Sequence, residues 1–258
     1  MISRDITAPE ASMLCSLCPV GAIDLATGSP GNNERSPAVP GANEHSNIIP
    51  GAGPMASPSR ETGESGCTID LGKCIFCREC EFALPGRIRF TNDYKLATNL
   101  RERLIVVSGN DHPVKLDPGS VRREILSMFG HALKLRQVSA AGDNSAEMEL
   151  NAAGNVNFDM GRYGIEFVAS PRHADGIVIT GPISLNMAEA LQICYDAIPA
   201  PKIIILAGTD AISGGLFSGS KALNREFLDN HPVDLYVPGN PPHPLTFING
   251  ILDLTGRK

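Results

Sequence analysis

The second half of the chain alternates short aliphatic runs with segments that carry apolar residues at helical spacing. Four β-rich runs occupy residues 164–169, 176–180, 202–207 and 233–237. Three segments between and after them have the apolar spacing of a helix, at 187–198, 222–228 and 245–254. Residues 202–207 are almost purely aliphatic, as in a strand buried on both faces of a parallel sheet. The alternation predicts a parallel, doubly wound α/β domain over residues 137–258.

The first half shows a weaker hydrophobic pattern. Short strands are predicted at residues 88–90 and 104–107. A helix is predicted over 121–136, inside a connecting segment at 111–136, from the apolar residues Ile125, Leu126, Phe129, Leu133 and Leu135. The preceding residues, 1–110, are predicted to form a small first domain.

A long polar segment interrupts that first domain. Residues from about 28 to 66 are rich in Gly, Pro, Ser and Asn, and few of them are apolar. Such a segment buries too little apolar surface to offset the entropy lost on ordering. We therefore expect a disordered insertion at this place, with a functional docking loop as the alternative.

Composition narrows the class of protein. The chain has 258 residues, a formal net charge of -6 and 42% hydrophobic residues, which suits one or two soluble domains. We expect no membrane span, because no apolar run approaches the roughly 20 residues that one needs. The first residues lack the apolar core of a signal peptide, which indicates a cytoplasmic protein. The acidic balance argues against nucleic acid as a partner.

The cysteines carry the most specific signal. Six of the seven lie before residue 81, a clustering that indicates metal binding instead of disulfides. Cys74, Cys77 and Cys80 have C-x2-C-x2-C spacing, the bacterial-ferredoxin arrangement, in which a remote Cys-Pro completes an iron–sulfur cluster. Cys18-Pro19 is such a pair. The sequence therefore predicts a ferredoxin-like α+β domain that binds one [4Fe–4S] cluster through four cysteines and transfers electrons.

Alternatives to this ligand set remain open. Cys67 makes a local C-x6-C-x2-C-x2-C set and is an alternate fourth ligand, and Cys15 is a further alternate. Four thiolates also hold zinc tetrahedrally. A second ferredoxin cluster is not expected, because Leu84-Pro85 stands where its Cys-Pro would be. The seventh cysteine, Cys194, lies on the apolar face of a predicted helix and is expected to be a core residue.

Both parts of the chain resemble subunits of one kind of redox complex. Residues 70–81, with the sequence DLGKCIFCRECE, and residues 88–94, IRFTNDY, resemble the polyferredoxin subunit of formate hydrogenlyase and its complex I relative. The region beyond residue 137 resembles the small subunit of energy-converting [NiFe] hydrogenases and the 20 kDa subunit of NADH:quinone oxidoreductase. That second likeness rests on RYGI at 162–165, SPRHAD at 170–175, TGP at 180–182, NMA at 186–188, AISGG at 211–215 and VDLYVPG at 233–239.

The resemblance implies a flavodoxin-like second domain and also a departure from its family. In that family the small subunit holds a proximal [4Fe–4S] cluster through four cysteines. Alignment on the flanking residues places those cysteines at Asp143, Ala146, Asp210 and Asn240. Alanine cannot bind iron, and Asp or Asn are hard oxygen donors poorly suited to an iron–sulfide cluster. The proximal cluster is therefore expected to be absent.

The resemblance further implies a non-catalytic electron-transfer subunit of a complex I-like or formate hydrogenlyase-like assembly. It would associate with the large subunit and membrane subunits of that complex, on the inner face of the cell membrane. The alternative is an architectural subunit with a vestigial redox module. Neither a dinucleotide fingerprint nor a Walker A motif is present, so no nucleotide site is expected.

Several polar residues near the aligned positions have two interpretations each. The family likeness implies a role for Arg172 and His173 in tuning the proximal cluster or docking a partner, whereas a plain turn would pair them with Asp175. Glu147 aligns with an acidic residue that can serve proton transfer, but without the cluster a solvated Glu is expected. Asp143 and Asp210 could approach each other and bind a cation such as Mg²⁺. His243 is expected to be a loop residue.

Overall fold

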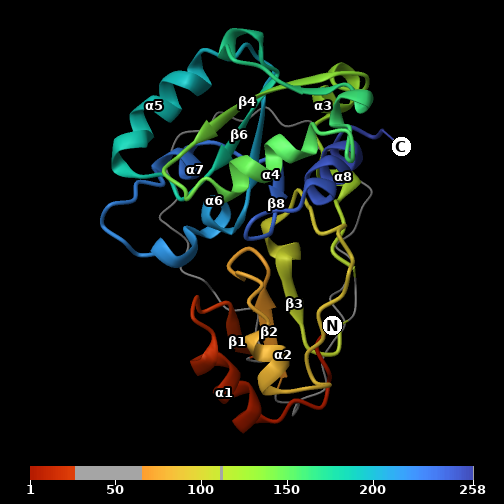
Figure 1. Cartoon of the computed structure of the whole chain (residues 1–258), viewed down its shortest axis with the longest axis vertical. Helices are drawn as coiled ribbons and strands as arrows, with labels where there is room; N and C mark the ends of the chain where they lie inside the picture. The colour runs from red at the N-terminus through yellow and green to blue at the C-terminus, as the bar shows by residue number, and fades with distance from the viewer. Residues whose placement is uncertain (27–65, 111–112, 258) are drawn as a thin grey trace, which may run out of the picture.

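The computed structural model of the chain describes residues 1–26, 66–110 and 113–257. They form two lobes stacked along the long axis of the molecule (Figure 1). We call residues 1–26 and 66–110 the cysteine lobe, and residues 113–257 the α/β lobe. The insertion predicted at 28–66 lies outside the described residues, apart from Gly66, which begins a strand. Among the described residues, no helix is long and apolar enough to cross a bilayer.

The cysteine lobe is a three-stranded antiparallel sheet of order β1-β2-β3 with two helices. Its elements are α1 (Ala8–Leu17), β1 (Ile23–Ala26), β2 (Gly66–Asp70), α2 (Glu79–Ala83), the 3-10 turn η1 (Arg101–Leu104) and β3 (Ile105–Val107). A capping box begins α1, in which the backbone N–H of Thr7 donates to the Glu10 carboxylate at 2.8 Å. This helix packs against β1 and α2.

The α/β lobe has a parallel five-stranded sheet of order β5-β4-β6-β7-β8, as the sequence predicts for a parallel α/β domain. The strands are β4 (Leu133–Ser139), β5 (Ile165–Phe167), β6 (Gly176–Thr180), β7 (Ile203–Ala207) and β8 (Leu235–Val237). The helices are α3 (Arg123–Met128), α4 (Ser145–Ala153), α5 (Leu185–Asp196), α6 (Thr209–Ser213), α7 (Glu226–Asn230) and α8 (Pro244–Leu254). Short 3-10 turns are η2 (Pro118–Ser120), η3 (Met160–Tyr163), η4 (Pro171–His173) and η5 (Gly215–Phe217).

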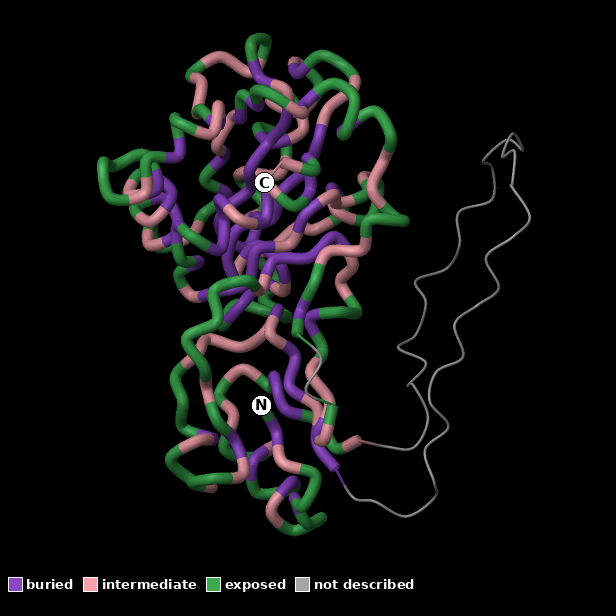
Figure 2. The backbone as a smooth tube through the Cα atoms, turned by 90° about the vertical axis from the view of Figure 1, so that its right-hand side faces the viewer, coloured by how far each residue is buried: buried purple, intermediate pink, exposed green. Residues whose placement is uncertain are grey.

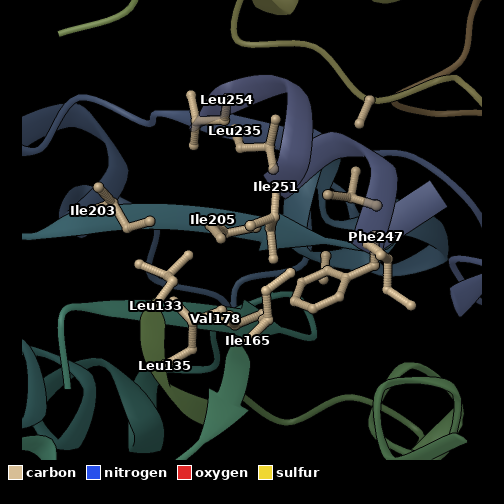
Figure 3. Packing of buried hydrophobic residues seen from close by; sticks show 14 of the residues in the cluster. Leu133, Leu135, Ile165, Val178, Ile203, Ile205, Leu235, Phe247, Ile251 and Leu254 are labelled. Atoms are coloured by element: carbon tan, nitrogen blue, oxygen red, sulfur yellow. The ribbon is translucent and has the colours of Figure 1, made fainter. Parts of the chain in front are cut away.

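Apolar side chains cover both faces of this sheet. Alternate residues of β7 point to opposite sides, so that Ile203 and Ile205 join one core and Ile204 and Leu206 join the other. In the first core, α8 packs against the strands through a row at helical spacing: Phe247, Ile251 and Leu254 (Figure 3). The second core lies under α5, α6 and α7. As a result, buried backbone runs through the middle of the α/β lobe, as Figure 2 shows in purple.

Three expectations about individual elements are wrong. The helix predicted over 121–136 ends at Met128, and residues 133–139 form β4, the strand between β5 and β6. Gly130 follows the helix, and Leu133 and Leu135 then point to one face as alternate residues of a strand. Residues 88–90 form no strand, and only Ile88 makes isolated bridges, to Ile2 and Pro85. The helix expected at 222–228 lies at Glu226–Asn230.

The two lobes contact each other through specific polar contacts. Thr98 and Tyr236 exchange two backbone hydrogen bonds, of 3.1 and 2.8 Å, which attach the segment before η1 to β8. The Thr209 hydroxyl, at the start of α6, donates to the Cys74 carbonyl at 2.9 Å. Thr209 is 0% exposed, so this bond lies within the junction. The loop before α2 is therefore fixed against the carboxyl end of β7.

Candidate metal centre

Four cysteines line one cavity in the cysteine lobe. Cys18 follows α1, Cys74 and Cys77 lie in the loop between β2 and α2, and Cys80 lies in α2. Apolar side chains form much of the remaining wall, among them those of Ile69 and Phe90. The structure thus brings together the four residues that the cysteine spacing predicts as ligands. Soft thiol donors around an apolar space are the donor set that iron–sulfur clusters require.

The loop between β2 and α2 turns tightly because two of its residues adopt positive φ. These are Phe76 at 56° and Arg78 at 65°, a conformation that costs energy for residues other than glycine. The turn places a backbone N–H close to a cysteine sulfur, since the N–H of Phe76 donates to Cys74 Sγ at 3.3 Å. On the opposite side of the cavity, the N–H of Ala22 donates to Cys18 Sγ at 3.2 Å. Such N–H groups favour a thiolate sulfur over a neutral thiol.

Burial works against ionisation of the same thiols in the metal-free chain. It raises the pKa of Cys74 to about 12, and it also raises the pKa of Cys80. A metal centre would therefore have to displace protons from buried sulfur. Across the described residues, no group of three or more His, Cys, Asp or Glu side chains is arranged to hold a metal ion. The four thiols nevertheless line one and the same cavity.

The alternate ligands lie elsewhere in the lobe. Cys67 is 0% exposed in β2, belongs to the apolar core, and burial raises its pKa to about 11. Cys15, on α1, packs against the same core. Neither is among the residues that line the cysteine cavity. Leu84, at the position of a second Cys-Pro, also packs against this core, which includes Ala11 and Leu14.

A second cavity lies at the carboxyl ends of the parallel strands. Its lining includes all four positions at which the family alignment places cysteines: Asp143, Ala146, Asp210 and Asn240. These residues follow β4, β7 and β8, and carboxyl ends of parallel strands meet at one edge of a sheet. Gly208, with φ of 97°, makes the turn from β7 into α6. We call this the oxygen-lined cavity, because it offers carboxylate and amide groups and no thiol.

The acidic groups of the oxygen-lined cavity influence one another. Hydrogen bonds from the side chain and backbone N–H of Ser145 lower the pKa of Asp143. Burial raises the pKa of Asp210, and the nearby charges of Asp143 and Glu147 raise it further. Asp143 and Asp210 line the same cavity, but they belong to no group among the described residues that could hold a metal ion.

The expectation of a solvated Glu147 is wrong. This residue is 6% exposed in α4, and its Oε1 lies 2.5 Å from the hydroxyl of Thr180 at the end of β6. A carboxylate buried this far requires such a partner. The contact joins α4 to the sheet beneath the oxygen-lined cavity.

Arg225 supports the same cavity and was not singled out from the sequence. Its guanidinium donates to the carbonyls of Ala211 at 2.7 Å, Ile212 at 2.9 Å and Pro182 at 3.1 Å. These carbonyls belong to α6 and to the loop after β6. Arg225 therefore fixes the helix that begins at Thr209 and carries Asp210. An arginine before a short helix gives no local signal of this role.

Four further residues lie away from the oxygen-lined cavity or beside it. Arg172 and His173 are exposed in η4, directly before β6 and thus at the amino edge of the sheet. Among the described residues they make no ion pair with Asp175, whose carboxylate instead accepts from the Lys134 backbone N–H at 2.7 Å. His243 is the N-cap of α8 and accepts from the N–H of Leu245. Cys194 packs against the second core, as expected.

Comparison with known proteins places the α/β lobe. The family model of the NADH ubiquinone oxidoreductase 20 kDa subunit matches residues 144–254. The probable membrane-bound hydrogenase subunit mbhJ of Pyrococcus furiosus is 32% identical over 129 residues, which cover 50% of this chain and 77% of that protein. The chain belongs to this 20 kDa subunit family. A further relative, an NADH-quinone oxidoreductase subunit of Heliobacterium modesticaldum, is 43% identical over 111 residues.

The match to these relatives is partial. The Heliobacterium alignment covers 43% of this chain and 63% of the relative, so the chain spans less than two thirds of that protein. Among solved structures, the membrane-bound sulfane sulfur reductase, an archaeal respiratory membrane complex, matches with a TM-score of 0.43 and 27% identity. That match covers 49% of this chain and 70% of the other. The family model begins at residue 144, beyond all four cysteines of the cysteine cavity.

Proposed function

We propose that this chain is an iron–sulfur electron-transfer subunit of a complex I-like or membrane-bound hydrogenase-like complex. The observation that carries the proposal is the cavity shared by Cys18, Cys74, Cys77 and Cys80. Its thiols and sulfur-directed N–H groups fit one [4Fe–4S] cluster, which would supply one-electron transfer when bound. In this proposal residues 1–110 form a ferredoxin-like domain fused to a 20 kDa subunit-like domain.

The oxygen-lined cavity does not fit a cluster. Members of the family usually bind a [4Fe–4S] cluster, but the donors gathered here are the carboxyl groups of Asp143, Glu147 and Asp210 and the amide of Asn240, with the methyl group of Ala146 beside them. These groups do not provide the thiolates that such a cluster needs. We therefore assign one cluster to the chain and derive no electron-transfer step through the α/β lobe.

The proposed partners follow from the relatives. They are named as subunits of a membrane-bound hydrogenase and of NADH-quinone oxidoreductase, so partner subunits of those kinds are expected for this chain. Peripheral attachment to the inner face of a membrane would then run through the partners. The proposal includes neither a nucleic-acid partner nor a catalytic centre on this chain.

A second candidate function is architectural. The thiol-free lining of the oxygen-lined cavity favours it, because a subunit whose α/β lobe carries no cluster can still scaffold a complex. In that case the cysteine cavity would be a remnant that binds no iron. Iron content separates the two functions directly.

The test is anaerobic purification followed by measurement of iron, acid-labile sulfide and the low-temperature EPR spectrum of the reduced protein. We expect about four irons per chain, as one [4Fe–4S] cluster requires. Cys77→Ala should abolish both the iron and the spectrum, whereas Cys194→Ala, in the α/β lobe, should change neither. Zinc or no iron in the wild type would exclude electron transfer and leave the architectural function. About eight irons would refute the single-cluster assignment.

A further inference from the structure

A third cavity, distinct from the two described above, lies beside the cysteine cavity and is much larger. Its volume is about 380 Å³. Apolar side chains dominate its lining, including those of Leu71, Leu96 and Val106. The polar and charged residues in the lining are Arg89, Thr91, Asp93 and Asn110. Small-molecule sites are typically apolar cavities of about 300–1,000 Å³ with a few polar groups. Size and lining therefore both suit a small ligand.

This cavity lies where the cores of the two lobes meet. Ile2 and Ile88 belong to the core of the cysteine lobe, whereas Val114 belongs to the second core of the α/β lobe. Leu71, also in the lining, packs against both cores. Junctions between domains are preferred places for ligand sites. A ligand here would contact both lobes at once.

One wall separates this cavity from the cysteine cavity. Ile69 and Phe90 line both spaces, so a single layer of side chains lies between them. Phe76, in the loop that carries Cys74 and Cys77, also lines the large cavity. It meets Phe90 edge-on, with ring centroids 6.2 Å apart and an interplanar angle of 71°. Two aromatic rings at one wall favour a flat ring as the occupant, by stacking or edge contact.

We propose that this cavity binds a small, uncharged planar ring compound with one polar substituent, and that its occupancy is linked to the redox state of the neighbouring cluster. The binding site stands on the cavity alone, and the linkage rests on the proposed function. A reduced cluster carries one more negative charge than an oxidised one. Replacing water beside it with an apolar ring disfavours the added charge, so occupancy lowers the reduction potential.

The linkage is reciprocal. If the ring lowers the potential, it must also bind the oxidised protein more tightly than the reduced protein, by the same free energy. We expect the oxidised protein to bind the ring about threefold more tightly than the reduced protein does. For one electron, a tenfold change in affinity corresponds to about 59 mV, so the reduction potential should fall by about 28 mV. Both quantities can be measured on the same preparation.

Two strand variants test the site. Val106 pairs with Ile69 across β2 and β3, so both side chains lie on the face that lines the cavity. Val106→Phe fills the cavity, whereas Ile105→Phe, at a 43% exposed residue of the same strand, adds the same ring on the other face. Leu96→Phe fills the cavity from another segment, should Val106→Phe not fold.

The experiment is calorimetric titration of the full chain with 2-naphthol, anaerobically, in the oxidised and dithionite-reduced forms, with an EPR-monitored redox titration alongside. We expect one saturable site in the wild type and in Ile105→Phe, and at least tenfold weaker binding in Val106→Phe. Absence of saturable binding, or equal binding in the filled variant, would overturn the site. Binding without a shift in potential would overturn the linkage. Binding in a wild type that holds no iron would support the site and refute only the proposed function.

Discussion

The cysteine cavity and the oxygen-lined cavity are both narrow, about 20 and 10 Å³, but they differ in their chemistry. The first gathers four thiols among apolar side chains. The second gathers the carboxylates of Asp143 and Asp210 with Asn240 and Ala146. The Thr209 hydroxyl connects them, because it belongs to the second cavity and donates to the Cys74 carbonyl at 2.9 Å. Two cavities in contact with each other therefore offer entirely different side-chain donors.

The difference extends to what stabilises each cavity. Four thiols that share a cavity gain their strongest bonds only when a metal centre is bound, so the cysteine lobe is expected to depend on metal. The oxygen-lined cavity already has its supports within the protein: Arg225 fixes α6, and the Glu147–Thr180 contact fixes α4. Hydrogen bonds within the protein therefore hold the loops around the oxygen-lined cavity in place.

The largest expected effect is loss of the cluster when its fourth ligand is removed. Cys18→Ala should abolish iron binding, because Cys18 lines the cavity with the three clustered cysteines. Cys67→Ala should keep about four irons per chain, since Cys67 lies in the core of β2. Iron and sulfide analysis of the two purified variants shows whether Cys18 or Cys67 is the fourth ligand. The reverse result would make Cys67 the fourth ligand.

Arg225 should have the largest effect on stability at the oxygen-lined cavity. Arg225→Met leaves the carbonyls of Pro182, Ala211 and Ile212 without their donor, at a cost of about 3 kcal/mol in the free energy of unfolding. Urea denaturation followed by circular dichroism measures the change. Arg225→Lys should recover only part of it, because an ammonium cannot form the planar fork of a guanidinium. Iron content should stay unchanged, and a variant that lost iron would show that the two cavities are not independent.

The contact between the cavities should have a smaller effect. Thr209→Val keeps the shape of the side chain but removes the donor to the Cys74 carbonyl, and should cost about 1.5 kcal/mol. Thr209→Ser keeps the hydroxyl and serves as the control. Amide hydrogen exchange should become faster in the loop between β2 and α2 in the valine variant only. Equal exchange in both variants would show that this bond does not fix the loop.

The sequence alone predicts a helix or strand correctly where the hydrophobic pattern of the segment is regular. The strand predicted at residues 176–180 is confirmed as Gly176–Thr180, because its apolar run is continuous. The strand between β5 and β6 was missed, because Leu133 also lies at helical spacing from Phe129. Residues 133–139 form a strand because they pair with β5 and β6, which lie about 30 to 40 positions away in the sequence. The hydrophobic periodicity of a short segment carries no information about strand partners at that separation.

The candidate sites show the same limit. Spacing selected four cysteines that the structure places in one cavity, because three of them lie within seven residues and a Cys-Pro marks the other. The burial of Glu147 depends on Thr180, 33 positions away, and the role of Arg225 depends on carbonyls from two other loops. Polar residues acquire such roles from tertiary contacts, and the types Glu and Arg alone predict a solvated surface.

The smallest expected effects are opposite pH dependences at two carboxyls of the oxygen-lined cavity. Burial raises the folded-state pKa of Asp210 above the ordinary 3.8, so its contribution to stability is present below that pH and is lost as the pH rises through the folded pKa. Asp210→Asn should therefore become increasingly stable relative to the wild type between about pH 4 and pH 7.

The Ser145 hydrogen bonds lower the pKa of Asp143, so the contribution of Asp143 to stability is present above pH 3.8 and is lost on acidification. Asp143→Asn should thus be less stable than the wild type at pH 7, and that difference should vanish in acid. Urea midpoints of the three proteins across this range measure both signs, and parallel profiles would show that the cavity does not distinguish the two carboxyls.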